Sequence, residues 1–103
     1  MKANANNTPI EIAYEDLPSP CNSFIDCRAV EEYEIAHYDG AINVPLQHVT
    51  ICIDSFPYKK EDTFFVYCKS GNRSCTFVTY MRSIGFTNCQ SITGGYQEWG
   101  QQC

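Results

Sequence analysis

The sequence predicts a single α/β domain built around a mainly parallel β-sheet. Short apolar strand candidates alternate along the chain with segments of helical composition, which is typical of a parallel sheet flanked by helices. A length of 103 residues suits one domain with one core, and 44% hydrophobic residues with 14% aromatics are typical of a globular protein. Residues 1–9 are polar and rich in Asn, so we expect a flexible tail before a single domain over residues 10–103.

Three short apolar or alternating runs in the first half of the chain predict strands, at residues 10–12, 23–27 and 41–44. Two segments of helix-forming composition lie between them, at residues 14–17 and 29–36. Pro18 ends the first of these segments, and Tyr38–Gly40 is a turn after the second. Pro45 ends the third strand and opens a brief helix. Residues 51–58 show no clear period, and we expect a helical turn or irregular structure there.

The second half of the chain contains the clearest strand and the clearest helix. Thr63–Tyr67 is an unbroken run of β-branched and aromatic residues, which predicts a central strand. Ser74–Ile84 is predicted to be a helix that ends before Gly85, a natural C-cap. Its apolar residues recur at helical spacing, at Phe77, Val78, Met81 and Ile84. The remaining predicted elements are a fifth strand, a tight turn and a closing helix, at residues 89–92, 94–95 and 96–102.

Cys68 is the candidate nucleophile, because it stands at the carboxyl end of the predicted central strand and begins a short loop that enters a helix. Active sites of parallel sheets lie beyond the carboxyl ends of the strands. The free N–H groups and partial positive charge of a helix N-terminus favour a thiolate over a thiol. Gly71 is able to adopt a positive φ, so we expect N–H groups of residues 69–73 to point toward the sulfur. A buried structural cysteine is the alternative.

The residues after Cys68 are the candidate loop for binding an anionic substrate: Lys69, Ser70, Gly71, Asn72, Arg73 and Ser74. Lys69 is suited to attracting a doubly charged sulfur donor as a point charge. Arg73 either binds the oxygens of the donor as a fork or braces the loop. The polar side chains of the loop offer hydrogen bonds, and Ser74 is also a candidate N-cap.

The charge distribution favours an anionic substrate and opposes nucleic acid as a partner. The net charge is −5, whereas binding to phosphates needs basic patches. Residues 1–57 carry a net −7 and residues 58–103 a net +2, so the candidate loop lies in the electropositive half. Chance placement of surface charge is the alternative explanation. No apolar run approaches the ~18 residues of a membrane span, so we expect no membrane partner.

The seven cysteines fit neither a zinc site nor a complete disulfide framework, because they form no CxxC pair and their number is odd. We therefore expect no metal, no other cofactor and a reducing compartment, the cytoplasm. A periplasmic location would require a signal peptide that has been removed. Three cysteines lie in apolar runs and are expected to be buried, namely Cys27, Cys52 and Cys89. Cys75 is either a resolving thiol for Cys68 or a buried helix residue.

Three segments together resemble a single-domain rhodanese. The first comprises Phe24-Ile25-Asp26-Cys27-Arg28, Glu32-Tyr33, His37 and Gly40-Ala41-Ile42-Asn43-Val44-Pro45. The second is the loop from Cys68 to Arg73, and the third is Ile92-Thr93-Gly94-Gly95-Tyr96-Gln97-Glu98-Trp99. Their order and approximate spacing match the family over residues 10–101. One departure is Ala36, where the family often has Gly before the His, so the turn geometry at this point is an open question.

The resemblance implies a rhodanese fold, a three-layer α/β domain whose five-stranded, mainly parallel sheet is flanked by helices. It also implies a thiosulfate sulfurtransferase, in which Cys68 takes a sulfane sulfur from an anionic donor such as thiosulfate as a persulfide. The acceptor would be cyanide or a thiol. In the family, the residues that match Asp26, Arg28 and His37 make structural hydrogen bonds behind the site, and a catalytic role for them is the alternative.

Three other functions remain open. A cysteine phosphatase or arsenate reductase also places Cys and Arg around an anion, but those enzymes resemble Cys-x5-Arg. Cys68 to Arg73 is Cys-x4-Arg, a shorter loop that fits a single sulfur atom. A persulfide carrier or docking module would deliver the sulfur to a protein partner or only bind one. A redox sensor would cycle Cys68 and Cys75 through a disulfide.

Overall fold

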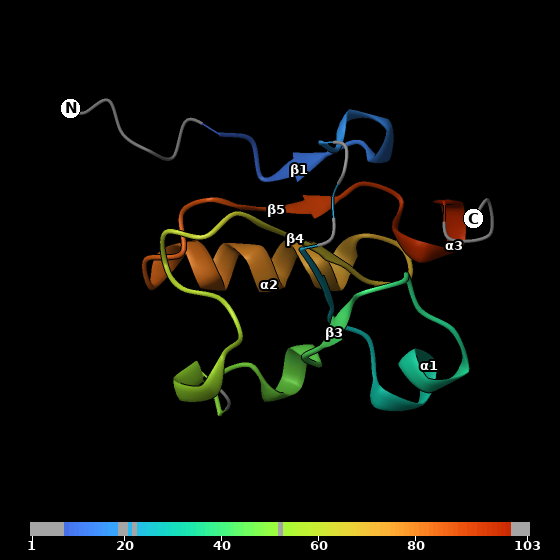
Figure 1. Ribbon diagram of the computed structural model, residues 1–103, viewed down its shortest axis with the longest axis horizontal. Coiled ribbons are helices and arrows are strands. Elements are labelled where there is room, and N and C mark those ends of the chain that lie inside the picture. The colour runs from blue at the N-terminus through green and yellow to red at the C-terminus, as the bar shows by residue number, and fades with distance from the viewer. Residues whose placement is uncertain (1–7, 19–20, 22, 52, 100–103) are drawn as a thin grey trace.

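Parallel strands form one sheet at the centre of the domain (Figure 1). The computed structural model describes residues 8–18, 21, 23–51 and 53–99. Within these residues the sheet has five strands: β1 (Glu11–Ile12), β2 (Phe24–Asp26), β3 (Ile42–Asn43), β4 (Phe64–Tyr67) and β5 (Cys89–Ile92). Their order is β1-β5-β4-β2-β3, and each neighbouring pair is parallel. The predicted parallel sheet is confirmed, and β4, which Cys68 directly follows, is its central strand.

Helical segments cover both faces of this sheet, as the predicted three-layer domain requires. The α-helices are α1 (Val30–Ile35), α2 (Asn72–Ser83) and α3 (Gly95–Trp99). The 3-10 turns are η2 (Tyr14–Asp16), η3 (Leu46–His48) and η4 (Ile53–Ser55). Side chains of α2, η3 and η4 pack into the core on one face, and side chains of α1, α3 and η2 pack on the other. Figure 1 shows α2 lying along the sheet beside β4 and β5, with which it makes most of its contacts.

The alternation of side chains along β2 and β4 decides which residues reach each face. Phe24 and Phe65 are register partners and lie in the core with α1 and α3. Ile25 and Val66, the next pair, lie in the core with α2. A period of two residues therefore places Cys68 on the α2 face, as it places Val66.

The structure corrects the predicted start of the long helix. α2 begins at Asn72, two residues before the predicted start, and its N-cap is Gly71 with φ of 106°. Ser74 lies inside the first turn, so its prediction as the N-cap was wrong. The reason is that the chain enters the helix through a left-handed residue, which Gly adopts at low cost and Ser does not.

Several smaller expectations are also resolved. In the described part of residues 51–58, the structure has the 3-10 turn η4, in agreement with the expected helical turn. Ala36 is the C-cap of α1 with φ of −165°, an extended conformation that needs no glycine. Of the expected tail, residues 8 and 9 are described, and the guanidinium of Arg82 on α2 donates to the carbonyl oxygens of both Thr8 and Pro9. Cys52 and the end of the closing helix beyond Trp99 lie outside the described residues.

Over the described residues, no helix combines the length and the apolar character needed to cross a membrane.

The buried face of α2 should dominate the stability of the domain. Phe77 is fully buried against the sheet, so Phe77→Ala should lower the free energy of unfolding by about 3–5 kcal/mol. Thr79 is exposed on the same helix, and Thr79→Ala should change it by about 0.5 kcal/mol or less. Urea denaturation of the two variants measures the difference. Equal losses would contradict the assignment of this face to the core.

Candidate active site

The Cys68 sulfur lies at the end of β4, beneath the loop that leads into α2. The backbone N–H groups of Gly71 and Ser74 donate to Cys68 Sγ, at N–S distances of 3.1 and 3.3 Å. The Ser74 side-chain oxygen lies 3.5 Å from the same sulfur. Cys68 has no solvent-exposed surface in this conformation. Polar donors therefore converge on one buried sulfur, which is the environment that a backbone nest provides for an anion.

The left-handed turn at Gly71 produces this convergence. Because φ is positive at Gly71, the chain reverses over the sulfur and α2 starts with its free N–H groups near Cys68. The two donors are the N–H groups of Gly71 and Ser74, whereas the sequence predicted donors over residues 69–73. The Ser74 hydroxyl also contacts Gly71 O at 3.2 Å and Ser91 Oγ on β5 at 2.6 Å. These contacts fix the first turn of α2 against the sheet.

Cys27 is a second thiol beside Cys68. The N–H of Cys27 donates to the carbonyl of Tyr67 at 3.0 Å, which continues the parallel register of β2 and β4 by one residue. Cys27 is therefore opposite Cys68, and both side chains are buried in the core on the α2 face. From the sequence, Cys27 was expected only as a small buried residue. Its position at the end of the strand next to β4 was the signal that could have placed it beside Cys68.

These contacts determine which of the two thiols ionises. The hydrogen bond from the Cys27 thiol contributes most to lowering the pKa of Cys68, followed by the Ser74 side chain and the N–H groups of Ser74 and Gly71. Burial opposes them, and the resulting pKa of Cys68 is about 4. The same hydrogen bond, together with burial, raises the pKa of Cys27 far above the usual range of a thiol. Cys68 is thus the thiolate at neutral pH, and Cys27 is the thiol that donates a hydrogen bond to it.

The N-terminus of α3 holds the other side of the loop. The N–H of Tyr96 donates to Cys68 O at 2.7 Å, and the N–H of Gln97 donates to Lys69 O at 3.0 Å. Gly95 makes this approach possible, because a Cβ there would lie 2.5 Å from Lys69 O and 2.6 Å from Cys68 O. Gly95 also has a positive φ of 66°. The Gly-Gly segment therefore forms its own turn and also lets α3 pack closely against the loop that follows Cys68.

Arg73 points to α1 and not to an open binding space. Its Nη1 and Nη2 donate to Glu32 Oε1 and Oε2, at 3.0 and 3.4 Å. Glu32 Oε1 also accepts a hydrogen bond from the N–H of Ala29 at the start of α1, at 2.9 Å. Of the two roles considered for Arg73, this geometry corresponds to bracing the loop. Glu32 was not singled out as a partner in the sequence.

Asp26 and Arg28 form a buried ion pair behind the loop. The Arg28 Nη2–Asp26 Oδ2 distance is 2.7 Å, and Arg28 Nε lies 3.0 and 3.1 Å from the two carboxylate oxygens. Arg28 Nη2 also donates to Ala36 O at the end of α1, at 2.6 Å. The guanidinium lies over the rings of Tyr96 and Tyr67, at 4.6 and 5.7 Å from their centroids. Arg28 thereby joins β2, α1, β4 and α3 at the carboxyl end of the sheet.

The remaining predicted site residues are exposed. His37 stacks on Tyr33 at a centroid distance of 3.7 Å, and its Nδ1 lies 2.8 Å from Tyr33 O. Over the described residues, these contacts keep His37 on α1 and do not connect it to the loop. The other exposed residues belong to the loop itself: Lys69, Ser70 and Asn72. Their side chains are thus in a position to meet a ligand that approaches from solvent.

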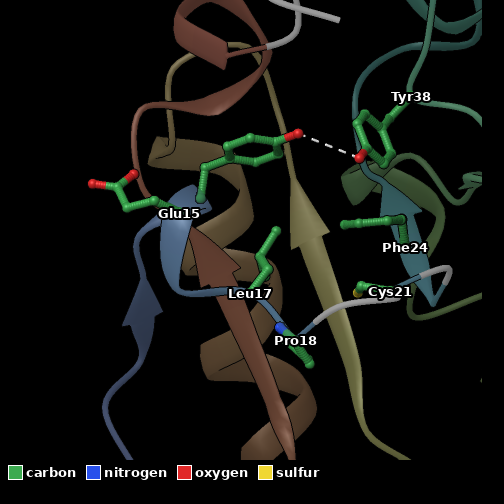
Figure 2. Close-up of a pocket in the computed structure, with 7 residues that line it drawn as sticks. Glu15, Leu17, Pro18, Cys21, Phe24 and Tyr38 are labelled. Atoms are coloured by element: carbon green, nitrogen blue, oxygen red, sulfur yellow. Dashed lines mark hydrogen bonds between the residues drawn. The ribbon is translucent and has the colours of Figure 1, made fainter.

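A separate pocket of about 280 Å³ lies on the opposite face of the sheet (Figure 2). It is lined by Tyr14, Glu15, Leu17, Pro18, Cys21, Phe24 and Tyr38. The hydroxyl oxygens of Tyr14 and Tyr38 lie 3.3 Å apart, and a dashed line marks the hydrogen bond at the Tyr38 hydroxyl in Figure 2. Because Phe24 belongs to the core on the α1 and α3 face, this pocket is not part of the Cys68 site.

Comparison with known proteins identifies the family. The Rhodanese-like domain model matches residues 10–102, which is most of the chain. The chain belongs to the rhodanese-like domain family. This result confirms the resemblance that the three sequence segments indicated, and it places Cys68, the ion pair and the Gly-Gly segment within one shared domain.

Individual relatives agree with this assignment. The chain is 37% identical over 78 residues to the adenylyltransferase and sulfurtransferase uba4 of Ogataea parapolymorpha, covering 76% of this chain and 20% of that protein. It is 30% identical over 90 residues to the tRNA uridine(34) hydroxylase of Yersinia pestis, covering 84% of this chain and 25% of that protein. The chain thus spans a fifth to a quarter of these curated relatives.

Solved structures share the fold. The human single-domain sulfurtransferase TSTD1 superposes with a TM-score of 0.82 at 22% identity, over 93% of this chain and 99% of that chain. SSP1007 from Staphylococcus saprophyticus superposes with a TM-score of 0.78 at 24% identity, over 89% and 94% of the two chains.

The close approach at Gly95 should make it less tolerant than a glycine of similar φ. Gly40→Ala adds a Cβ that meets nothing within 4 Å at φ of 86°, and should cost about 1–2 kcal/mol of unfolding free energy from backbone strain alone. Gly95→Ala adds a clash with two loop carbonyls, and should cost at least about 2 kcal/mol more. Urea denaturation compares the two. Equal costs would contradict the packing of α3 on the loop.

Proposed function

We propose that this domain is a sulfurtransferase that carries a sulfane sulfur as a persulfide on Cys68. The observation that carries the proposal is the buried Cys68 sulfur that accepts N–H donors from Gly71 and Ser74 at the start of α2, in a chain of the rhodanese-like family. The pKa of about 4 keeps this sulfur ionised at neutral pH, and only a thiolate attacks a sulfane sulfur.

The proposed reaction has two steps that use the same thiolate. Cys68 attacks the outer sulfur of thiosulfate or a similar anionic donor, the bond between the two donor sulfurs breaks, and sulfite leaves. An acceptor such as cyanide or a thiol then attacks the outer sulfur of the persulfide, and Cys68 leaves as a thiolate. A low pKa weakens a thiolate as a nucleophile but improves it as a leaving group. The hydrogen-bond donors around Cys68 Sγ therefore favour the second step, in which Cys68 is the leaving group, more than the first.

The loop supports a single sulfur atom better than a larger oxyanion. The N–H groups of Gly71 and Ser74 are directed at Cys68 Sγ itself, and Arg73 is paired with Glu32. A phosphatase needs both the backbone N–H groups and the arginine around the oxygens of its substrate. This geometry favours sulfur transfer over phosphate or arsenate chemistry.

Entry of the donor requires the loop to move. Because Cys68 is fully buried, the outer sulfur of a persulfide has no room in the resting conformation. We infer that Ser70 and the exposed side chain of Lys69 shift when the donor binds, and that the positive charge of Lys69 attracts the donor. The first turn of α2, fixed by Ser74 and Arg73, would stay in place.

The acceptor is either a small thiophile or a protein. The relative from Ogataea parapolymorpha is named a sulfurtransferase, and this chain matches a fifth of it. This similarity supports sulfur transfer by the domain. It also supports an interpretation in which the domain is part of a longer protein that delivers the sulfur to a partner. The five described cysteines are free, which supports a reducing compartment such as the cytoplasm.

Intact-mass spectrometry tests the proposal. Thiosulfate should convert the wild-type protein to a species heavier by one sulfur atom, and cyanide should remove that atom as thiocyanate. Cys68→Ser should stay at its original mass. Cys75→Ser is the matched control and should load like the wild type. Cys75 Sγ contacts Glu11 Oε2 at 3.0 Å and is not one of the groups that donate to Cys68 Sγ.

Two outcomes would contradict the proposal. Loading that survives Cys68→Ser would remove Cys68 as the carrier. Failure of the wild type to load from any sulfane donor, together with hydrolysis of an aryl phosphate, would replace sulfur transfer with phosphatase chemistry.

A further inference from the structure

Two buried thiols end neighbouring strands in register. Asp26 and Tyr67 are the last paired residues of β2 and β4, and the hydrogen bond from Cys27 N to Tyr67 O carries the same register to Cys27 and Cys68. Phe24 and Phe65 face one core, Ile25 and Val66 face the other, and Cys27 and Cys68 return to the core of Ile25. Both side chains therefore leave the sheet on the same side.

The separation of the two positions suits a disulfide. Neighbouring strands lie about 4.8 Å apart, and the Cα atoms of a disulfide are usually about 4.4–6.8 Å apart. Cys27 and Cys68 each follow the last residue of their strand, Asp26 and Tyr67. Small backbone shifts there can bring the two sulfurs together without separating the strands.

Cys75 is less suited to this pairing. Its Sγ lies 3.0 Å from Glu11 Oε2 and 3.7 Å from Ser91 Oγ, so it faces β1 and β5 at the far side of α2 from Cys27. Ser74 stands between these groups and Cys68, with its Oγ in contact with both Ser91 Oγ and the Cys68 sulfur. Cys27 is the register neighbour of Cys68 on the adjoining strand and lies in the same core.

We propose that Cys27 is a resolving thiol, which closes a disulfide with Cys68 after a peroxide has oxidised Cys68. The Cys68 thiolate attacks one oxygen of hydrogen peroxide, the O–O bond breaks, and Cys68 becomes a sulfenic acid while hydroxide leaves. The sulfur of Cys27 then attacks Cys68 Sγ, the S–O bond breaks, and the Cys27 proton leaves with the hydroxyl group as water. Two thiol groups are oxidised and one peroxide is reduced, so the step is balanced.

The environment of the pair favours this sequence. Oxidation removes the negative charge from Cys68, and with it the hydrogen-bond acceptor that keeps the Cys27 thiol protonated. Cys27 thus becomes easier to ionise only after Cys68 has reacted. Hydrogen peroxide is small and neutral, which suits a sulfur with no exposed surface. The disulfide would protect Cys68 from irreversible oxidation to a sulfinic acid until a thiol reductant restores it.

This inference needs a reactive Cys68 thiolate but does not depend on sulfur transfer. It replaces Cys75, which the sequence suggested as the partner of a redox sensor, with Cys27. Its test therefore reads the oxidation state of single cysteines and not an activity.

Peptide mapping after peroxide treatment is the test. The reduced protein is treated with hydrogen peroxide, its free thiols are blocked, and it is digested with trypsin and chymotrypsin without reductant. Cleavage after Phe24, Arg28, Tyr67, Lys69 and Arg73 places Cys21, Cys27, Cys68 and Cys75 in four different peptides. We expect a crosslink between the peptides of Cys27 and Cys68, lighter by two hydrogen atoms than the free pair and released by dithiothreitol.

Matched variants separate the two candidate partners. Cys75→Ser should form the Cys27–Cys68 crosslink as the wild type does. Cys27→Ser and Cys27→Ala should lose it, and Cys68 should instead be trapped by dimedone as a sulfenic acid and proceed to sulfinic acid. Because Ser and Ala differ in polarity, a folding defect in one of the two Cys27 variants would leave the other as the test. The peptide map of the wild type does not depend on either variant. Wild-type protein that links Cys68 to Cys75, or that takes Cys68 to sulfinic acid with Cys27 free, would overturn the proposal.

Discussion

Stabilisation of one buried negative charge is the constraint on which the carboxyl end of this sheet depends. A thiolate at Cys68 without solvent contact would be costly unless donors replaced water. The N–H groups of Gly71 and Ser74, the Ser74 side chain and the Cys27 thiol supply those donors. The left-handed Gly71 and the early start of α2 meet this need, because they turn these N–H groups toward the sulfur.

The surrounding contacts hold the donors in place. Arg73 connects the first turn of α2 to Glu32 on α1. At the N-terminus of α3, backbone N–H groups donate to the carbonyl oxygens of Cys68 and Lys69. Arg28, paired with Asp26 and lying over the rings of Tyr67 and Tyr96, connects these elements behind the loop. Such a frame costs no reorganisation when charge moves on or off the sulfur, which is how preorganised donors assist a reaction. The side chains of Lys69 and Ser70 in this loop are exposed.

Much of the fold was predictable from the sequence, because local pattern and tertiary structure agree in this chain. The run Thr63–Tyr67 and the period of Phe77, Val78 and Met81 correctly placed the central strand and the long helix. Contacts between distant segments were not predictable: the Arg73–Glu32 pair, the approach of Gly95 to the loop and the position of Cys27 beside Cys68 depend on strand order. Ser74 was misplaced as an N-cap because propensity favours Ser there, while positive φ requires Gly71.

The ionisation of Cys68 in the folded protein tests the account most directly. The ultraviolet absorbance of thiolates is titrated for the wild type and for Cys68→Ser, with circular dichroism confirming that both stay folded, and the difference isolates one sulfur. The account predicts that Cys68 is a thiolate at neutral pH and protonates only as the pH falls toward its pKa of about 4. A difference signal that appears only near the ordinary thiol pKa of ~8.5 would contradict it.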